Sequence, residues 1–147
     1  MFTDIEQQTL DIDWFFTNYE EIGFGASAGG KLPKSVAQSS ENQRLLSVFF
    51  DSMPQTSPII INPELNKFIT NGVDDRYLND FVIMAKRGLF AYDKTKMNNF
   101  SDPYYHLVAK PVNPLKFEGL PVKIKEILKW SKYSGAMNSI INTNSVE

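Results

Sequence analysis

The order of apolar and polar residues near the start of the chain predicts a β-hairpin. Residues 12–16 are aromatic and β-prone, residues 17–20 are typical of a turn, and residues 21–26 form a returning strand. Because side chains alternate between the two faces of a strand, Trp14 and Phe16 are expected to share the core side, which leaves Phe15 outside.

A helix is predicted after the glycine- and proline-containing segment 29–33. The spacing of Ser40 and Gln43 matches a capping box, in which each side chain bonds the backbone near the other. Helical spacing then places one apolar stripe on this segment, made of Leu45, Leu46, Phe49, Phe50 and Met53. Pro54 and Pro58 end the helix, and the apolar run 59–61 predicts a short buried strand.

The second half of the chain predicts two more helices and a strand pair. After an Asn71-Gly72 turn, Asp74 or Asp75 is expected to cap a helix that stops at the sequence Lys-Arg-Gly of residues 86–88. Residues 89–92 and 104–110 are β-prone and separated by a polar loop, which predicts an antiparallel pair. Pro121 suits the first turn of a last helix, whose inner face carries Ile124, Ile127, Leu128 and Ser131.

Strand pairs interspersed with about three helices, without a regular βαβ repeat, favour an α+β domain built on a mainly antiparallel sheet. We expect one domain over residues 1–133 and a polar tail over residues 134–147. A chain of 147 residues without cysteine suits a single domain in a reducing compartment. Its acidic start lacks the basic and apolar regions of a signal peptide, so the expected location is the cytoplasm.

Charge is distributed unevenly along the chain. Residues 1–30 carry six acids and no base, whereas residues 110–132 carry six lysines against two glutamates. The lysines near Trp130 cover much of a helix circumference and the pI is about 5.4, so a solvated face is favoured over direct nucleic-acid binding. Aromatic anchors with an acidic rim are typical of protein interfaces. The candidate partner-binding residues are Asp11, Asp13, Phe15, Tyr19, Glu20, Glu21, Asp74, Asp75 and Asp80.

Residues 25–31 match the phosphate-binding pattern GxxxxGK, which offers a second interpretation: a small-molecule or nucleotide-binding domain, or a small hydrolase, that also uses His106. However, Leu32 occupies the position of the magnesium-binding hydroxyl, and Pro33 delays the helix that should begin at the lysine. The overlapping residues 23–28 match the looser dinucleotide pattern GxGxxA, but no βαβ unit surrounds them. The glycines are better explained by a bulge, a close backbone approach or a turn.

The remaining titratable residues give no assembled catalytic or metal signature. His106 is the only histidine, and its place in a predicted strand favours a hydrogen-bonded structural role over general-base catalysis. Asp11 and Asp13 are two positions apart and Asp74 and Asp75 are adjacent, a pairing that carboxylate catalysis also uses. Their positions at a strand edge and a helix start favour solvation and capping. We therefore predict no catalytic residue, cofactor or metal site.

The segment from Asp13-Trp14-Phe15-Phe16 through Ile22-Gly23-Phe24 to the small residues 26–30 resembles the opening of small bacterial proteins that include immunity proteins of polymorphic toxin systems. The resemblance covers about the first quarter of the chain. It implies a non-enzymatic α+β protein of the bacterial cytoplasm that neutralises a cognate toxin by direct binding, without a cofactor. Its acidic residues would suit a basic partner such as a nuclease toxin.

Overall fold

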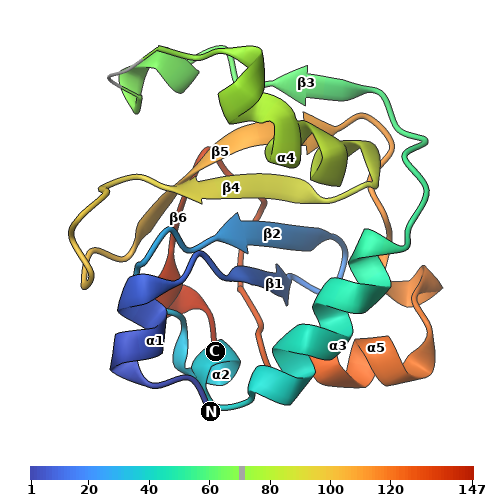
Figure 1. Cartoon of the computed structure of the whole chain (residues 1–147). Coiled ribbons are helices and arrows are strands. Elements are labelled where there is room, and N and C mark those ends of the chain that lie inside the picture. Colours follow the sequence, from blue (N-terminus) through green and yellow to red (C-terminus); the bar gives the residue numbers. More distant parts are fainter. Residues whose placement is uncertain (70–71) are drawn as a thin grey trace.

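The computed structural model describes residues 1–69 and 72–147 as an α+β fold, in which helices pack on a six-stranded, mostly antiparallel curled sheet (Figure 1). The helices are α1 (Asp4–Thr9), α2 (Lys34–Ala37), α3 (Ser40–Asp51), α4 (Asp75–Lys86) and α5 (Val122–Leu128). The strands are β1 (Asp13–Thr17), β2 (Ile22–Ala26), β3 (Ile59–Ile61), β4 (Phe90–Lys94), β5 (Tyr104–Pro111) and β6 (Ile140–Asn142). The predicted fold class is confirmed.

The strands follow the order β1-β2-β4-β5, and β5 then pairs with both β3 and β6. All pairs are antiparallel except β2 with β4. Because β4 lies along one edge of β5, β3 and β6 share the opposite edge, with β3 at residues 109–111 and β6 at residues 104–106. The segment 134–147, predicted as a polar tail, thus contributes a strand to the sheet.

Both faces of the sheet are covered, which gives two apolar cores. Helices α3, α4 and α5 pack on one face, around Phe24, Phe50 and Phe81. On the other face, α2 and the C-terminal segment pack around Trp14 and Tyr92. The expectation that Trp14 and Phe16 face a core is confirmed, but the expectation that Phe15 lies outside is wrong. Phe15 is 1% exposed because the second face is also covered by helices.

The glycines of β2 serve the close approach of aromatic rings from β1. Gly23 lies opposite Phe16 and Gly25 opposite Trp14 in the antiparallel register. A Cβ atom on Gly25 would lie 2.5 Å from the Trp14 ring, and one on Gly23 would lie 2.2 Å from the Phe16 ring. The predicted close backbone approach is therefore confirmed, and the β1–β2 register contains no bulge.

Several local predictions hold and others need correction. Asp74 caps α4 by accepting from the amide of Tyr77, and Gly88 follows the helix with a φ of 99°. The predicted turn at Asn71-Gly72 lies partly outside the described residues, since Asn71 is not among them. The isoleucine strand is wrong as a buried element, because β3 is an edge strand whose Ile60 is 47% exposed.

The helix prediction also missed two elements and one cap. α3 is capped by Ser39, whose side chain accepts from the amide of Asn42, so the predicted capping box of Ser40 and Gln43 is wrong. α1 begins with a true capping box between Thr3 and Glu6, which the sequence prediction missed. The four-residue α2 was also missed.

Candidate functional site

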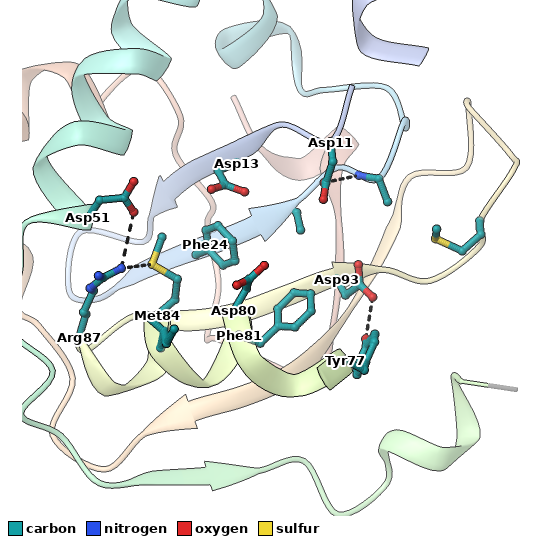
Figure 2. A pocket seen from close by; sticks show the side chains of 14 residues that line it. Asp11, Asp13, Phe24, Asp51, Tyr77, Asp80, Phe81, Met84, Arg87 and Asp93 are labelled. Atoms are coloured by element: carbon teal, nitrogen blue, oxygen red, sulfur yellow. Dashed lines mark hydrogen bonds and ion pairs between the residues drawn. The ribbon is translucent and has the colours of Figure 1, made fainter. Parts of the chain in front are cut away.

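A cleft of about 400 Å³ opens where the N-terminal end of β1 approaches α3 and α4 (Figure 2). Its apolar floor is formed by residues that include Phe24, Phe81 and Met84. Five carboxylates from four separate parts of the chain line it, and we call this the acidic cleft: Asp11 before β1, Asp13 in β1, Asp51 at the end of α3, Asp80 in α4 and Asp93 in β4.

Backbone pairing positions the two carboxylates of the hairpin. Asp13 is the first residue of β1 and pairs with Ala26, while its carbonyl accepts from the Gln43 side chain at 2.8 Å. Two residues earlier, the Asp11 carboxylate accepts from the amide of Ala28 at 2.9 Å. Because Asp13 shares a strand face with Phe15, it projects from the face of the sheet on which α3, α4 and α5 pack. The carboxylate thus lies at the rim of a core.

Burial and neighbouring negative charges make two carboxyl groups of this cleft weaker acids. Burial raises the pKa of Asp13 to about 6, and the negative charges of Asp11, Asp51 and Asp80 add to the rise. Burial also raises the pKa of Asp93 to about 6, although the hydrogen bond from Tyr77 opposes that rise. Near neutral pH the cleft therefore holds carboxylates whose charge is poorly compensated by the protein.

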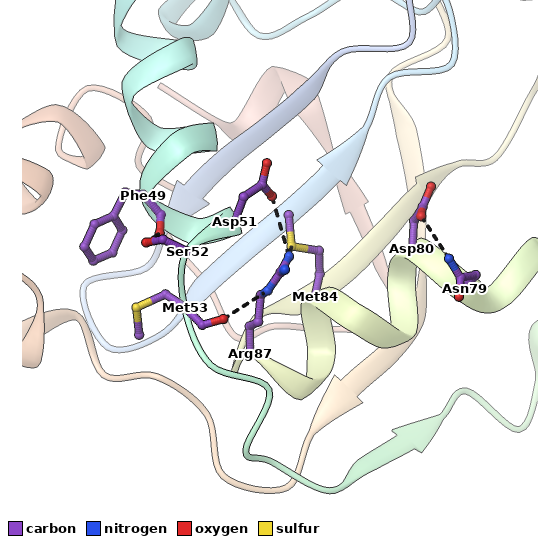
Figure 3. A network of polar contacts seen from close by, with 8 residues as sticks. All are labelled: Phe49, Asp51, Ser52, Met53, Asn79, Asp80, Met84 and Arg87. Atoms are coloured by element: carbon purple, nitrogen blue, oxygen red, sulfur yellow. Dashed lines mark hydrogen bonds and ion pairs between the residues drawn. The ribbon is translucent and has the colours of Figure 1, made fainter.

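One cation borders the cleft, and it is already engaged. The Arg87 guanidinium lies 3.5 Å from the Asp51 carboxylate and donates to the carbonyl of Met53 at 3.2 Å, which ties the end of α4 to the end of α3 (Figure 3). Among the residues that the structure describes, Asp80 receives one hydrogen bond, of 3.3 Å, from the side-chain amide of the neighbouring Asn79. Within the lining residues, five carboxylates thus face a single guanidinium.

A second cavity, of about 560 Å³, adjoins the cleft and is named here the His106 pocket. The Tyr77 hydroxyl donates to Asp93 at 2.6 Å and lies 3.5 Å from Nε2 of His106, while Nδ1 of His106 lies 3.0 Å from the Thr95 hydroxyl. The imidazole also stacks on Phe68, with ring centroids 4.8 Å apart and planes at 6°. Burial lowers the pKa of His106 to about 4, so the ring is neutral at physiological pH. His106 is a buried, hydrogen-bonded histidine, in keeping with the structural role predicted from the sequence.

The candidate interface residues do not form one surface. Asp11, Asp13 and Asp80 meet in the acidic cleft. Tyr19, Glu20 and Glu21 lie at the turn, at the opposite end of the hairpin, which five strand residues place about 13 Å away. Asp74 caps α4 and borders the His106 pocket, whereas Asp75 lies exposed in the first turn of that helix. Phe15, being buried, is removed from the set.

The glycine loop offers no cradle for phosphate because its amides are already occupied. The N–H groups of residues 27–32 all donate within the protein, to Leu10, Asp11, Ile12, Ser27, Phe100 and Gln7. Only a four-residue helix follows, whereas a phosphate loop opens a long one. Moreover, Lys31 and His106 line different cavities, so the residues proposed for a nucleotide site or hydrolase do not share a pocket.

The sequence interpretation missed Asp51 and Asp93. Asp51 stands in the last turn of α3, where the helix dipole disfavours an acid, and that anomaly was a usable signal. Asp93 shares a strand face with the buried Ala91, so alternation alone places a carboxylate at the rim of the core. Neither signal reveals that the two residues line one cleft, since that depends on how α3 packs against the sheet.

Trp130, flanked by lysines on the C-terminal side of α5, is 62% exposed and borders a separate hollow with Tyr19 and Lys132.

Over residues 1–69 and 72–147, no group of three acidic, histidine or cysteine side chains is placed to hold a metal ion. None of the helices in those same ranges is long and apolar enough to cross a membrane. Comparisons with protein-family models, curated proteins and solved structures found no match for this chain.

Proposed function

We propose that this protein is a non-enzymatic binding module that holds a basic segment of a protein partner in the acidic cleft. The observation that carries the proposal is the gathering of five carboxylates around a concave site of about 400 Å³, with one engaged guanidinium as the only cation in the lining. A lysine or arginine side chain entering this cleft would supply the missing counter-charge. Its aliphatic stem would pack on the apolar floor.

The partner class follows from this chemistry and from the resemblance of the N-terminal segment to immunity proteins. A basic protein toxin, such as a nuclease, presents the cations that the cleft lacks, and burial of the cleft by the partner would block the toxin surface. Opposite charge on the two proteins would also speed their encounter. We therefore favour an immunity protein located in the bacterial cytoplasm, acting in a one-to-one complex.

Two matched double variants test the cleft against the rest of the acidic surface. Asp13→Asn with Asp80→Asn removes two negative charges inside the cleft, while Glu20→Gln with Glu21→Gln removes two charges at the hairpin turn. The candidate partners are the basic proteins encoded by genes adjacent to this one, and affinity is measured by isothermal titration calorimetry. We expect the cleft pair to weaken binding at least tenfold, equivalent to about 1.4 kcal/mol, and the turn pair to change it less than threefold.

The matched design separates specific recognition from long-range attraction. Equal losses in the two double variants would show that net charge, and not the cleft, governs the encounter. Loss confined to the turn pair would move the interface to the turn. A partner that binds the wild-type protein and both double variants equally would rule out the acidic cleft as its site.

A second candidate function is carboxylate-based catalysis, which the raised pKa values of Asp13 and Asp93 favour because general acids and bases are tuned in this way. A hydrolase of this kind would turn over a small substrate, and Asp93→Asn would abolish that turnover. A screen of glycoside and ester substrates with the wild-type protein distinguishes the two functions.

A further inference from the structure

The acidic cleft and the His106 pocket are not independent hollows. Tyr77, Asp93 and Met97 line both of them, and the 2.6 Å hydrogen bond between Tyr77 and Asp93 forms the ridge between the two. The partition is thus about one side chain thick. Both volumes, about 400 and 560 Å³, fall within the range of roughly 300–1,000 Å³ that ligand pockets usually occupy.

The two hollows differ in chemistry, which indicates two kinds of occupant. The acidic cleft gathers carboxylates, as described above. The His106 pocket presents the Phe68 ring, the stacked neutral imidazole of His106 and the Met97 thioether. The polar atoms of the imidazole are within reach of Thr95 and Tyr77, so this side chain offers its ring face to a ligand. The charged residues Asp74, Arg76, Asp93 and Lys94 also line the pocket.

Met97 is suited to close such a site. Its side chain is 59% exposed in the connection between β4 and β5, and it borders both hollows. Methionine adapts its shape to varied apolar surfaces and makes favourable contacts with aromatic rings. An exposed methionine at the junction can therefore pack on a ligand that occupies both hollows.

We infer that the two hollows bind one extended segment of the protein partner, with a lysine or arginine in the acidic cleft and an aromatic or large aliphatic side chain in the His106 pocket. This inference rests on the proposed function of the cleft and adds the apolar half of the recognition. In an extended chain, residues two positions apart point to the same face and are separated by about 7 Å. That spacing fits a ridge one side chain thick, so the recognised pattern is a basic residue, any residue, and then a large apolar residue.

Short synthetic peptides test this pattern directly. The first carries Lys-Gly-Phe between Ser-Gly and Gly-Ser ends, the second replaces Phe by Gly, and the third replaces Lys by Gln. Affinities are measured by NMR titration of the full-length protein. We expect the Lys-Gly-Phe peptide to bind about tenfold more tightly than the Lys-Gly-Gly peptide, because it buries an additional ring.

Three variants locate the aromatic half of the site. Phe68→Ala removes the ring that stacks on His106, and Met97→Ser changes an exposed residue whose loss should not affect folding. Val122→Ser is the control, since Val122 is 67% exposed on α5 and borders neither hollow. We expect Phe68→Ala and Met97→Ser to cancel the advantage of the Phe peptide, while Val122→Ser retains it.

Each outcome bears on a different step. If the Phe and Gly peptides bind equally, the inference about the His106 pocket is overturned while the acidic cleft stands. If the advantage of Phe persists in both Phe68→Ala and Met97→Ser, the ring binds elsewhere and the inference fails. If no peptide binds, or the Gln peptide binds as tightly as the Lys peptide, the proposed function fails together with the inference.

Discussion

Replacing Asp13 by Asn should stabilise the protein at alkaline pH, because the cleft holds this carboxylate under electrostatic stress. Burial and the neighbouring Asp11, Asp51 and Asp80 raise the pKa of Asp13 from 3.8 to about 6. The folded state therefore binds a proton on Asp13 more tightly than the unfolded state does. Deprotonation consequently costs more free energy in the folded state.

The sign of the pH dependence follows from this difference. Below about pH 4 the carboxyl is protonated in both states and imposes no penalty. The penalty grows between about pH 4 and 6 and is complete above that window. A difference of roughly two pH units corresponds to about 3 kcal/mol as an upper bound. The Asn variant lacks this penalty. Over residues 1–69 and 72–147 the Asp13 carboxylate makes no hydrogen bond, so the substitution removes none.

We expect Asp13→Asn to raise the free energy of unfolding by about 1–3 kcal/mol near pH 8 and to leave it nearly unchanged near pH 4. For a chain of this size the gain corresponds to an increase in Tm of about 3–9 °C. Urea unfolding followed by tryptophan fluorescence measures the difference at each pH. The titration of His106 occurs in both proteins and cancels in the comparison.

Asp75→Asn is the matched control, since Asp75 is exposed in the first turn of α4, where a negative charge favours the helix. This variant should lose a few tenths of a kcal/mol at about pH 8. An Asp13→Asn protein that gains nothing at pH 8, or gains equally at pH 4, would refute the account of a cleft strained by uncompensated charge.

Two further predictions concern the packing of the sheet. Gly25→Ala should destabilise the protein by about 1–3 kcal/mol because its methyl group would lie 2.5 Å from the Trp14 ring, whereas Gly119→Ala, which meets nothing within 4 Å, should be nearly neutral. Thermal unfolding of both variants checks this, and equal effects would contradict it. Ile141→Ala should cost about 2–5 kcal/mol by leaving a cavity at a side chain that is 1% exposed, while Ile140→Ala, at 48% exposure, should cost under about 1 kcal/mol. If urea unfolding finds the two isoleucine variants equally stable, β6 is not part of the folded core.

The sequence by itself determined most of the local structure. The aromatic run that ends at Phe16 and the returning strand specify the hairpin, because both segments are β-prone and turn residues lie between them. Asp74 and Gly88 mark the ends of α4, because capping and positive φ are requirements of a few neighbouring residues. These signals depend only on residues within a few positions of one another, so they can be recognised without knowing which distant segments pack together.

Only the tertiary structure decided which residues meet. Phe15 is buried because helices cover the second face of the sheet, a fact that alternation along β1 cannot express. The segment 134–147 forms β6 because β5 leaves an edge open beside β3, and edge pairing is a property of the assembled sheet.

The acidic cleft has the same origin. Asp13, Asp51 and Asp93 are 38 to 80 residues apart in sequence and come together only when α3 packs against the hairpin and β4 pairs with β2. The sequence revealed an acidic N-terminal region but could not indicate that Asp11 and Asp13 would border a cleft while Glu20 and Glu21 would lie at a distant turn. Long-range packing, which local patterns do not encode, sets the site.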